Sequence, residues 1–144
     1  MGTDDKWLVE FSYPPKELNP NNARGHWAKR RRPAKRYRYE CFILTRQAIA
    51  TNGWRIDQLK AVVEAGQGVH LFLDIYPPDR RPRDDDNIIA AFKAGRDGLA
   101  DALNIDDRHF RIHPVVHRDQ PVDGRMIRVS ITSGPGAARH LANQ

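Results

Sequence analysis

Apolar and polar positions along the chain follow two periods, and these periods predict four strands and two helices. Runs rich in β-branched and aromatic residues predict strands over residues 7–13, 69–76, 110–117 and 126–132. Apolar residues at helical spacing predict helices over residues 34–50 and about 87–103. The predicted core-facing positions of the helices are Tyr37, Cys41, Leu44, Ala48, Ile88, Phe92, Leu99 and Leu103.

Proline, glycine and asparagine mark the ends of these elements, because they stop strands or helices. The stop signals are Pro14-Pro15, Pro77-Pro78, Asn52-Gly53 and Asn104. Asp86 is the predicted N-cap of the second helix, since a carboxylate there can accept hydrogen bonds from unpaired backbone N–H groups.

The element order β-α-β-α-β-β predicts a single α+β domain with a small mixed sheet and two packed helices. Residues 17–33 are expected to form a long basic loop. The last two strands are expected to form a pair joined through residues 121–124. We expect the domain to span residues 1–132 and residues 133–144, which lack a core pattern, to form a flexible C-terminal tail.

Length and composition favour a folded, soluble protein. The 144 residues suit one domain, and 40% are hydrophobic. No run approaches the ~18 apolar residues of a membrane span, and the first residues lack the apolar core of a signal peptide. Cys41 is the only cysteine, so no intramolecular disulfide can form. We therefore expect a cytoplasmic protein that does not associate with membranes.

Positive and negative charges are concentrated in different parts of the chain. The net charge is +6, which favours a polyanionic partner. No acid lies between Leu18 and Tyr39, and that segment carries Arg24, Lys29, Arg30, Arg31, Arg32, Lys35, Arg36 and Arg38. The acids concentrate later, at Asp84, Asp85, Asp86, Asp97, Asp101, Asp106 and Asp107.

The three consecutive carboxylates after the second predicted strand suggest a metal site. In an extended backbone Asp84 and Asp86 point the same way, so both can approach one cation. Mg²⁺ prefers oxygen ligands and keeps several waters, so two or three carboxylates suffice. A chain that returns after the second helix could add a third carboxylate from Asp106-Asp107. The alternative is that the aspartates only cap the helix.

Lys93 shares a helical face with Asp86. At ~100° per residue, the residues Asp86, Ala90, Lys93, Asp97 and Asp101 fall within a sector of ~80°. A lysine two turns from the carboxylates could contact a phosphate or stabilise developing charge. The alternative is a solvated lysine on a polar helix face.

Cations interleaved with His26, Trp27, Tyr37 and Tyr39 are typical of a nucleic-acid surface, where cations contact phosphates and aromatic rings stack on unpaired bases. The alternative is a solvated loop and helix face. The predicted DNA-binding residues, extended towards the carboxylates by an arginine-rich turn, are Arg24, Lys29, Arg30, Arg31, Arg32, Lys35, Arg36, Arg80, Arg81 and Arg83.

His109, His113 and His117 repeat every fourth residue, which on a helix would resemble a zinc site. Pro114-Val115-Val116 favours a strand instead, where residues four apart are separated by ~13 Å. We therefore do not expect these histidines to share one metal.

The chain resembles the RusA family of Holliday junction resolvases, as found in phages and prophages. The resemblance lies in an arginine-rich turn, a D-x-D-N motif and a downstream acidic pair. The matching residues are Pro78-Asp79-Arg80-Arg81-Pro82-Arg83-Asp84-Asp85-Asp86-Asn87 and Asp106-Asp107, preceded by Leu18-Asn19-Pro20-Asn21 and Arg24-Gly25-His26-Trp27-Ala28-Lys29. The similarity covers residues 7–132.

This resemblance implies that Asp84, Asp86 and Asp107 are catalytic carboxylates that bind Mg²⁺, or Mn²⁺ in its place. It also implies a homodimer that makes paired symmetric nicks in four-way DNA during recombination and repair. Two residues depart from the family pattern. Asp85 stands where the family usually has an apolar residue, and Ala90 stands where its catalytic lysine can lie, so Lys93 is the proposed substitute.

The sequence thus favours a magnesium-dependent endonuclease that resolves four-way DNA junctions. One alternative is a noncatalytic DNA-binding protein, such as a phage regulator, in which the acidic cluster only caps a helix. Another is a structure-specific nuclease that prefers flaps or forks.

Overall fold

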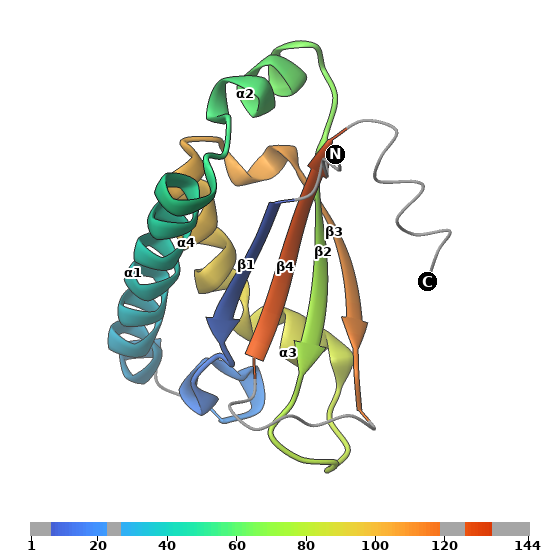
Figure 1. Cartoon of the computed structure of the whole chain (residues 1–144). Coiled ribbons are helices and arrows are strands. Elements are labelled where there is room, and N and C mark those ends of the chain that lie inside the picture. Colours follow the sequence, from blue (N-terminus) through green and yellow to red (C-terminus); the bar gives the residue numbers. More distant parts are fainter. Residues whose placement is uncertain (1–6, 23–26, 119–125, 134–144) are drawn as a thin grey trace.

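A four-stranded mixed sheet forms one layer of the molecule, and α1, α3 and α4 lie on one side of it (Figure 1). The computed structural model describes residues 7–22, 27–118 and 126–133. The strands are β1 (Trp7–Ser12), β2 (Val69–Tyr76), β3 (Phe110–Val116) and β4 (Met126–Ser133). The helices are α1 (Trp27–Asn52), α2 (Ile56–Glu64), α3 (Asp85–Ala91) and α4 (Lys93–Leu103). The α+β class with a mixed sheet is as predicted.

The strand order is β1-β4-β2-β3, so the predicted pairing of the last two strands is wrong. Strand β4 lies between β1 and β2 and is antiparallel to both, whereas β3 is parallel to β2 at the edge. The sequence fits these positions. Pro114 in β3 has no N–H to donate, which suits an edge strand. Ile127, Val129 and Ile131 of β4 are all buried, as expected of a central strand.

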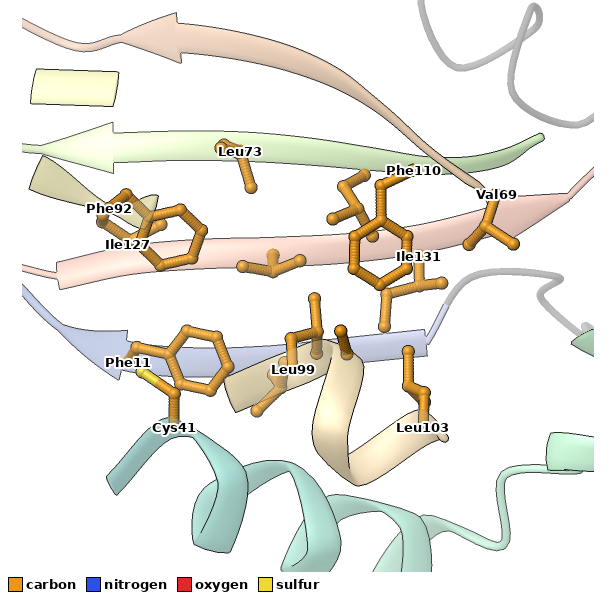
Figure 2. Close-up of a cluster of buried hydrophobic side chains, with 14 of the residues drawn as sticks. Phe11, Cys41, Val69, Leu73, Phe92, Leu99, Leu103, Phe110, Ile127 and Ile131 are labelled. Carbon is orange, nitrogen blue, oxygen red and sulfur yellow. The ribbon is translucent and has the colours of Figure 1, made fainter. Parts of the chain in front are cut away.

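The hydrophobic core lies between the sheet and the helices (Figure 2). Phe11, Leu73 and Ile131 come from three strands, and Leu99 and Leu103 come from α4. Fully burying one such side chain contributes about 1.5–3 kcal/mol. These contacts fix α4 against the sheet and thereby determine which of its faces remains at the surface.

Cys41 is a core residue, as its helical spacing predicts. Its side chain is fully buried and forms no disulfide. Burial raises the pKa of the Cys41 thiol to about 12, so the thiol stays protonated at neutral pH.

Helix α1 begins earlier than predicted. Residues 17–33 were expected to form a loop, but the helix starts at Trp27 and includes Pro33. Between β1 and α1 the described residues form only short 3-10 helices, η1 (Lys16–Leu18) and η2 (Pro20–Asn22). Lysine and arginine are good helix formers, and the helix continues through Pro33 although an interior proline removes a hydrogen bond and its ring crowds the preceding turn. The end at Asn52-Gly53 is confirmed, since Gly53 has φ +67°.

The second predicted helix is two helices. A break at Phe92 separates α3 from α4, and this residue has φ −83° and ψ −2°. The Phe92 ring is buried against Phe11 and Tyr37, with ring centroids 6.1 and 6.4 Å away. Asn104 ends α4 in the left-handed region at φ 56°, as predicted. Helix α2 was not predicted.

In the part of the chain that the structure describes, no helix combines the length and the apolar character that crossing a membrane requires. The tail was predicted over residues 133–144, but Ser133 is the last residue of β4, and residues 134–144 lie outside the described residues.

Candidate functional site

The three consecutive aspartates at the start of α3 have different neighbours. Asp84, rather than the predicted Asp86, is the N-cap, and its Oδ1 accepts a hydrogen bond from the Asp86 N–H at 2.9 Å. Asp84 takes this role because its backbone is extended while Asp85 already begins the helix. Asp85 forms an ion pair with Arg118.

Asp86 is exposed and, within residues 7–22, 27–118 and 126–133, its carboxylate forms no hydrogen bond or ion pair. Its backbone is already capped by Asp84, so the Asp86 side chain has no structural role in starting the helix. A free, exposed carboxylate beside a second one is a suitable ligand for a hard cation.

The arginine-rich turn before α3 is held together by Asp79. Arg83 donates to Asp79 Oδ1 at 2.8 Å and to the Asp79 carbonyl oxygen at 3.0 Å. Arg81 donates its backbone N–H to the same carboxylate at 3.0 Å. This N–H and the two guanidinium groups lower the pKa of Asp79 to about 2. Arg81 and Arg83, both predicted to contact DNA, therefore also order this turn, whereas Arg80 is exposed.

Lys93 joins two carboxylates on one side of α4. Its Nζ donates to Asp97 Oδ1 at 2.7 Å and to Asp107 Oδ2 at 2.9 Å. Arg96 Nε lies 3.8 Å from the same Asp107 oxygen. The hydrogen bond from Lys93 lowers the pKa of Asp107. Partial burial opposes the charge of Lys93, but the two carboxylates raise its pKa overall. Lys93 is therefore a fixed cation at neutral pH.

The structure brings Lys93 and Asp107 together but does not gather Asp84, Asp86 and Asp107 into one ligand set. Val69 pairs with Phe110 in the parallel register, so Asp107 lies near the start of β2, whereas Asp84 follows its end. Among the described residues, no three His, Cys, Asp or Glu side chains form a group that could hold a metal ion.

Three adjoining hollows follow the line along which α1 packs against α4, and the first also reaches Ala90 and Ala91 of α3; we call them together the α1–α4 groove. The first, of ≈ 330 Å³, includes Arg30, Ala90, Lys93 and Asp97. The second, of ≈ 350 Å³, shares Asp97 with the first. It is lined mainly by charged residues, namely Arg38, Asp97, Asp101, Asp106 and Asp107.

The third hollow, of ≈ 490 Å³, shares Arg38 and Asp101 with the second and also includes Lys35, Tyr39 and Phe42. At the other end of the groove, Asp86 lies one turn before Ala90 on the same face of α3. The groove therefore runs from Ala90 and Lys93 to an aromatic hollow, and Asp86, which lines none of the three hollows, lies one helical turn beyond its first end.

Helix α1 supplies the basic wall of the groove. The cations of α1 that line the hollows are Arg30, Arg31, Lys35 and Arg38. Arg32, Lys35 and Arg36 are exposed, and the described residues include no ion-pair partner for them, but Arg32 and Arg36 line none of the hollows. Arg30 donates to the Leu18 carbonyl oxygen at 3.2 Å. Lys29 and Arg31 are also exposed. The predicted contacts Arg24 and His26 lie outside the described residues.

The two tyrosines of the basic segment have different environments. Tyr37 is buried, and its hydroxyl donates to the Ser12 carbonyl oxygen at 2.6 Å, so it is not available to stack on a base. Burial raises the Tyr37 pKa well above its ordinary value. Tyr39, in contrast, is 64% exposed.

Sequence reasoning did not assign Arg38, Asp97 or Asp101 to the site. Arg38 donates to both carboxylate oxygens of Asp101, at 2.7 and 2.9 Å, and so joins α1 to α4 across the groove. The signal for the two acids was present in the sequence, since both share the helical face of Lys93.

The strand assignment is confirmed for His113, whereas His109 lies in η3 (Asp107–His109) and His117 directly follows β3. His113 lies in β3, and its Nε2 is 2.8 Å from Nδ1 of His70 in β2. His117 Nε2 lies 2.9 Å from Asp74 Oδ1. His113 and His117 thus each have a separate polar partner on β2.

No model of a known protein family matches the chain. A protein of Xylella fastidiosa (strain Temecula1 / ATCC 700964), described as an uncharacterized protein, is 40% identical over 131 residues. The matched region covers 91% of this chain and 79% of the relative. The similarity therefore includes most of the sheet and the whole groove.

Proposed function

Because the chain belongs to the family of this uncharacterized Xylella fastidiosa protein, whose name gives no activity, we propose a function from the groove itself. The proposed function is that of a metal-dependent endonuclease that acts on branched DNA. Its basic wall would bind the phosphate backbone, and its free carboxylate would take part in cleavage. The D-x-D-N motif and the Asp106-Asp107 pair, which resemble the RusA family, support the same activity.

The proposal rests on the exposed carboxylate of Asp86, which has no partner among the described residues. Capping accounts for Asp84, and the ion pair with Arg118 accounts for Asp85. No contact among the described residues accounts for an exposed negative charge at Asp86. An exposed carboxylate without a partner among the described residues, one helical turn from a groove that basic residues line, is instead suited to binding a cation together with a phosphate.

The donor chemistry at the start of α3 fits Mg²⁺ or Mn²⁺ with Asp84 and Asp86 as the protein ligands. Mg²⁺ is often held by one or two carboxylates, with water and phosphate oxygens as its other ligands. Such an ion would supply an activated water and neutralise the leaving oxygen. Asp107 is held by Lys93 and Arg96 elsewhere in the groove, so we assign it the positioning of Lys93 rather than this ion.

The residues of the chain have separate tasks in this proposal. Arg32, Lys35 and Arg36 bind phosphates along α1. Lys93, held by Asp97 and Asp107, places a positive charge beside the bound backbone and stabilises the negative charge that develops during cleavage. Its raised pKa means that it acts as a cation and not as a base.

Branched DNA is the proposed substrate because the family that the acidic motif resembles cuts four-way junctions. Paired nicks require two sites, so we propose a homodimer as the active form. Recognition through phosphates depends more on the shape of the DNA than on a long sequence.

A cleavage assay on synthetic DNA tests this function. A four-way junction incubated with the protein and Mg²⁺ should be nicked symmetrically, and EDTA should abolish the nicks. Flaps, forks and plain duplex of the same sequence should be compared. Preferential cutting of flaps or forks would support the nuclease activity but contradict the four-way junction as the preferred substrate. Intact strands on every DNA, with Mg²⁺ or Mn²⁺ present, would contradict the proposal.

One specific observation favours a second candidate, a DNA-binding protein that does not cut. Asp84, Asp85 and Asp107 all have structural partners, and Asp107 does not lie with the first two. The same assay separates the candidates, because a noncatalytic protein would shift the junction on a native gel and leave its strands intact.

A further inference from the structure

Tyr39 is an aromatic side chain left at the surface of a basic helix. It is 64% exposed, more than the other exposed large hydrophobic residues among those described, Leu8 at 47% and Val115 at 38%. Its ring lies beside that of Phe42, with centroids 6.2 Å apart and planes inclined by 31°. Together they form the apolar floor of the third hollow of the groove.

Positive charges surround this apolar floor. Lys35 lies one turn before Tyr39 on the same helical face and lines the same hollow. Arg36 lies about one helical turn before Tyr39, and Arg46 lies two turns after it. Both arginines are exposed. Asp101, the acid in the hollow, is neutralised by its two hydrogen bonds with Arg38.

We propose that the Tyr39 hollow is a stacking site for an unpaired nucleobase of the bound DNA. The inference rests on the DNA binding in the proposed function, and it does not depend on cleavage. The ring of Tyr39 would stack on the face of the base, and Lys35 and Arg36 would bind the flanking phosphates. An aromatic ring beside a basic groove is the arrangement by which proteins hold single-stranded nucleic acid.

The position of the hollow determines which part of a DNA substrate reaches it. The hollow adjoins the acidic one at Arg38 and Asp101, at the opposite end of the groove from Asp86. A duplex arm lying along α1 would therefore bring a nucleotide near its end to Tyr39. At a branch point such a nucleotide can leave its base pair at low cost, which a nucleotide inside a duplex cannot.

The charge around the hollow favours a nucleic acid over a second copy of this chain. The exposed faces of Lys35, Arg36 and Arg46 would repel the same residues of another copy placed symmetrically on the hollow. They attract the phosphates on either side of a base. Every base has a stacking face, so the site should accept any of the four.

Fluorescence of 2-aminopurine tests the inference directly. The probe is placed either as one unpaired nucleotide in a duplex or within a fully paired duplex, and protein is added with EDTA present so that no metal-dependent cleavage can occur. The wild-type protein should quench the unpaired probe. Tyr39→Ala should lose the quenching and bind the unpaired DNA roughly tenfold more weakly. The affinity of Tyr39→Ala for the paired duplex should stay within about twofold of the wild-type affinity.

Three further variants distinguish stacking from other contacts. Tyr39→Phe should retain the quenching, because it keeps the ring, and Tyr39→Leu should lose it. Val115→Ala, at an exposed apolar residue of β3, should behave as wild type. All variants change exposed side chains, so equal thermal unfolding midpoints are expected.

The outcomes separate this inference from the proposed function. If Tyr39→Ala binds and quenches the unpaired DNA as wild type does, the stacking site is wrong and DNA binding stands. If wild type binds neither DNA, both proposals are wrong. If Tyr39→Ala loses self-association by sedimentation and keeps the quenching, the hollow is a contact between copies and the inference is overturned.

Discussion

Asp84, Asp85 and Asp86 follow one another in the chain, yet each has a different relation to the fold. Asp84 caps α3, Asp85 pairs with Arg118, and Asp86 has no partner among the described residues. A side chain without a structural partner can be changed at little cost to stability. These three positions therefore offer matched substitutions that separate folding from function.

Removing the Asp84 cap should destabilise the protein. Asp84→Ala leaves the Asp86 N–H unsatisfied and should lower the free energy of unfolding by about 1 kcal/mol, within the 0.5–2 kcal/mol seen for lost N-caps. Asp84→Asn should stay close to wild type, because asparagine caps equally well. Urea unfolding measures both. Equal stability of Asp84→Ala and wild type would show that the cap does not hold α3.

The Lys93 contact should control the ionisation of Asp107. Because the pKa of Asp107 is lower in the folded protein, the contact with Lys93 stabilises the fold at pH values above the ordinary aspartate pKa of about 3.9. This stabilisation is lost as the pH falls through the pKa of Asp107 in the folded protein. Lys93→Met should raise the Asp107 pKa towards its ordinary value, as measured by NMR titration of the side-chain carboxyl carbon. Lys60→Met, on α2, serves as the control. An unchanged Asp107 pKa in Lys93→Met would contradict the ion pair.

Helical spacing could predict part of this cluster but not all of it. Lys93 and Asp97 are four residues apart on one helix, so the sequence alone places them side by side. The approach of Asp107 depends on how the chain leaves Asn104 and enters β3, which no local pattern specifies. The separation of Asp107 from Asp84 likewise depends on the full length of α3 and α4.

At the scale of elements, the core-facing positions of the helices were predictable and the breaks were not. Buried Tyr37, Cys41 and Leu99 follow the helical period. The early start of α1 was missed because Pro33 is normally a stop signal. The break at Phe92 was missed because the helical spacing of apolar residues continues across it. The backbone bends at Phe92, yet its ring is still buried.

The close packing of α1 on α4 depends on Gly98. A Cβ at this position would collide with the Arg38 carbonyl oxygen and the Phe42 backbone nitrogen. Alanine is favoured over glycine inside a helix by about 1 kcal/mol, so Gly98→Ala would stabilise an unpacked α4. We expect the collision to prevail, with a loss of about 1–3 kcal/mol in the free energy of unfolding measured in urea. A more stable Gly98→Ala protein would contradict this packing.

At the scale of the whole molecule, sequence patterns could not predict the order of the strands in the sheet. The chain places β4 between β1 and β2, and this arrangement follows from long-range packing rather than from the short connection between β3 and β4. The charge separation, in contrast, was visible in the sequence. The described lysines and arginines of the basic segment, residues 18–39, lie in α1, and the acidic residues from Asp84 to Asp107 lie in α3 and α4 or directly before and after them.

The basic wall should make DNA binding depend on salt. Plotted as the logarithm of affinity against the logarithm of salt concentration, each phosphate contact contributes a slope of about −0.9. Arg36→Gln should reduce the steepness by about one contact, as measured by fluorescence anisotropy across a salt series. Lys60→Gln, on α2 away from the groove, should leave it unchanged. Equal slopes for all three proteins would exclude Arg36 as a phosphate contact.

The most direct test of the central claim is the nicking rate of a four-way DNA junction with Mg²⁺, compared between wild type, Asp86→Asn and Asp85→Asn. Asp86→Asn should bind the junction and unfold as wild type does, yet lose nicking by about 100-fold or more. Asp85→Asn, which removes a neighbouring charge, should keep most of the activity. Undiminished nicking by Asp86→Asn would contradict the assignment of this free carboxylate to the reaction.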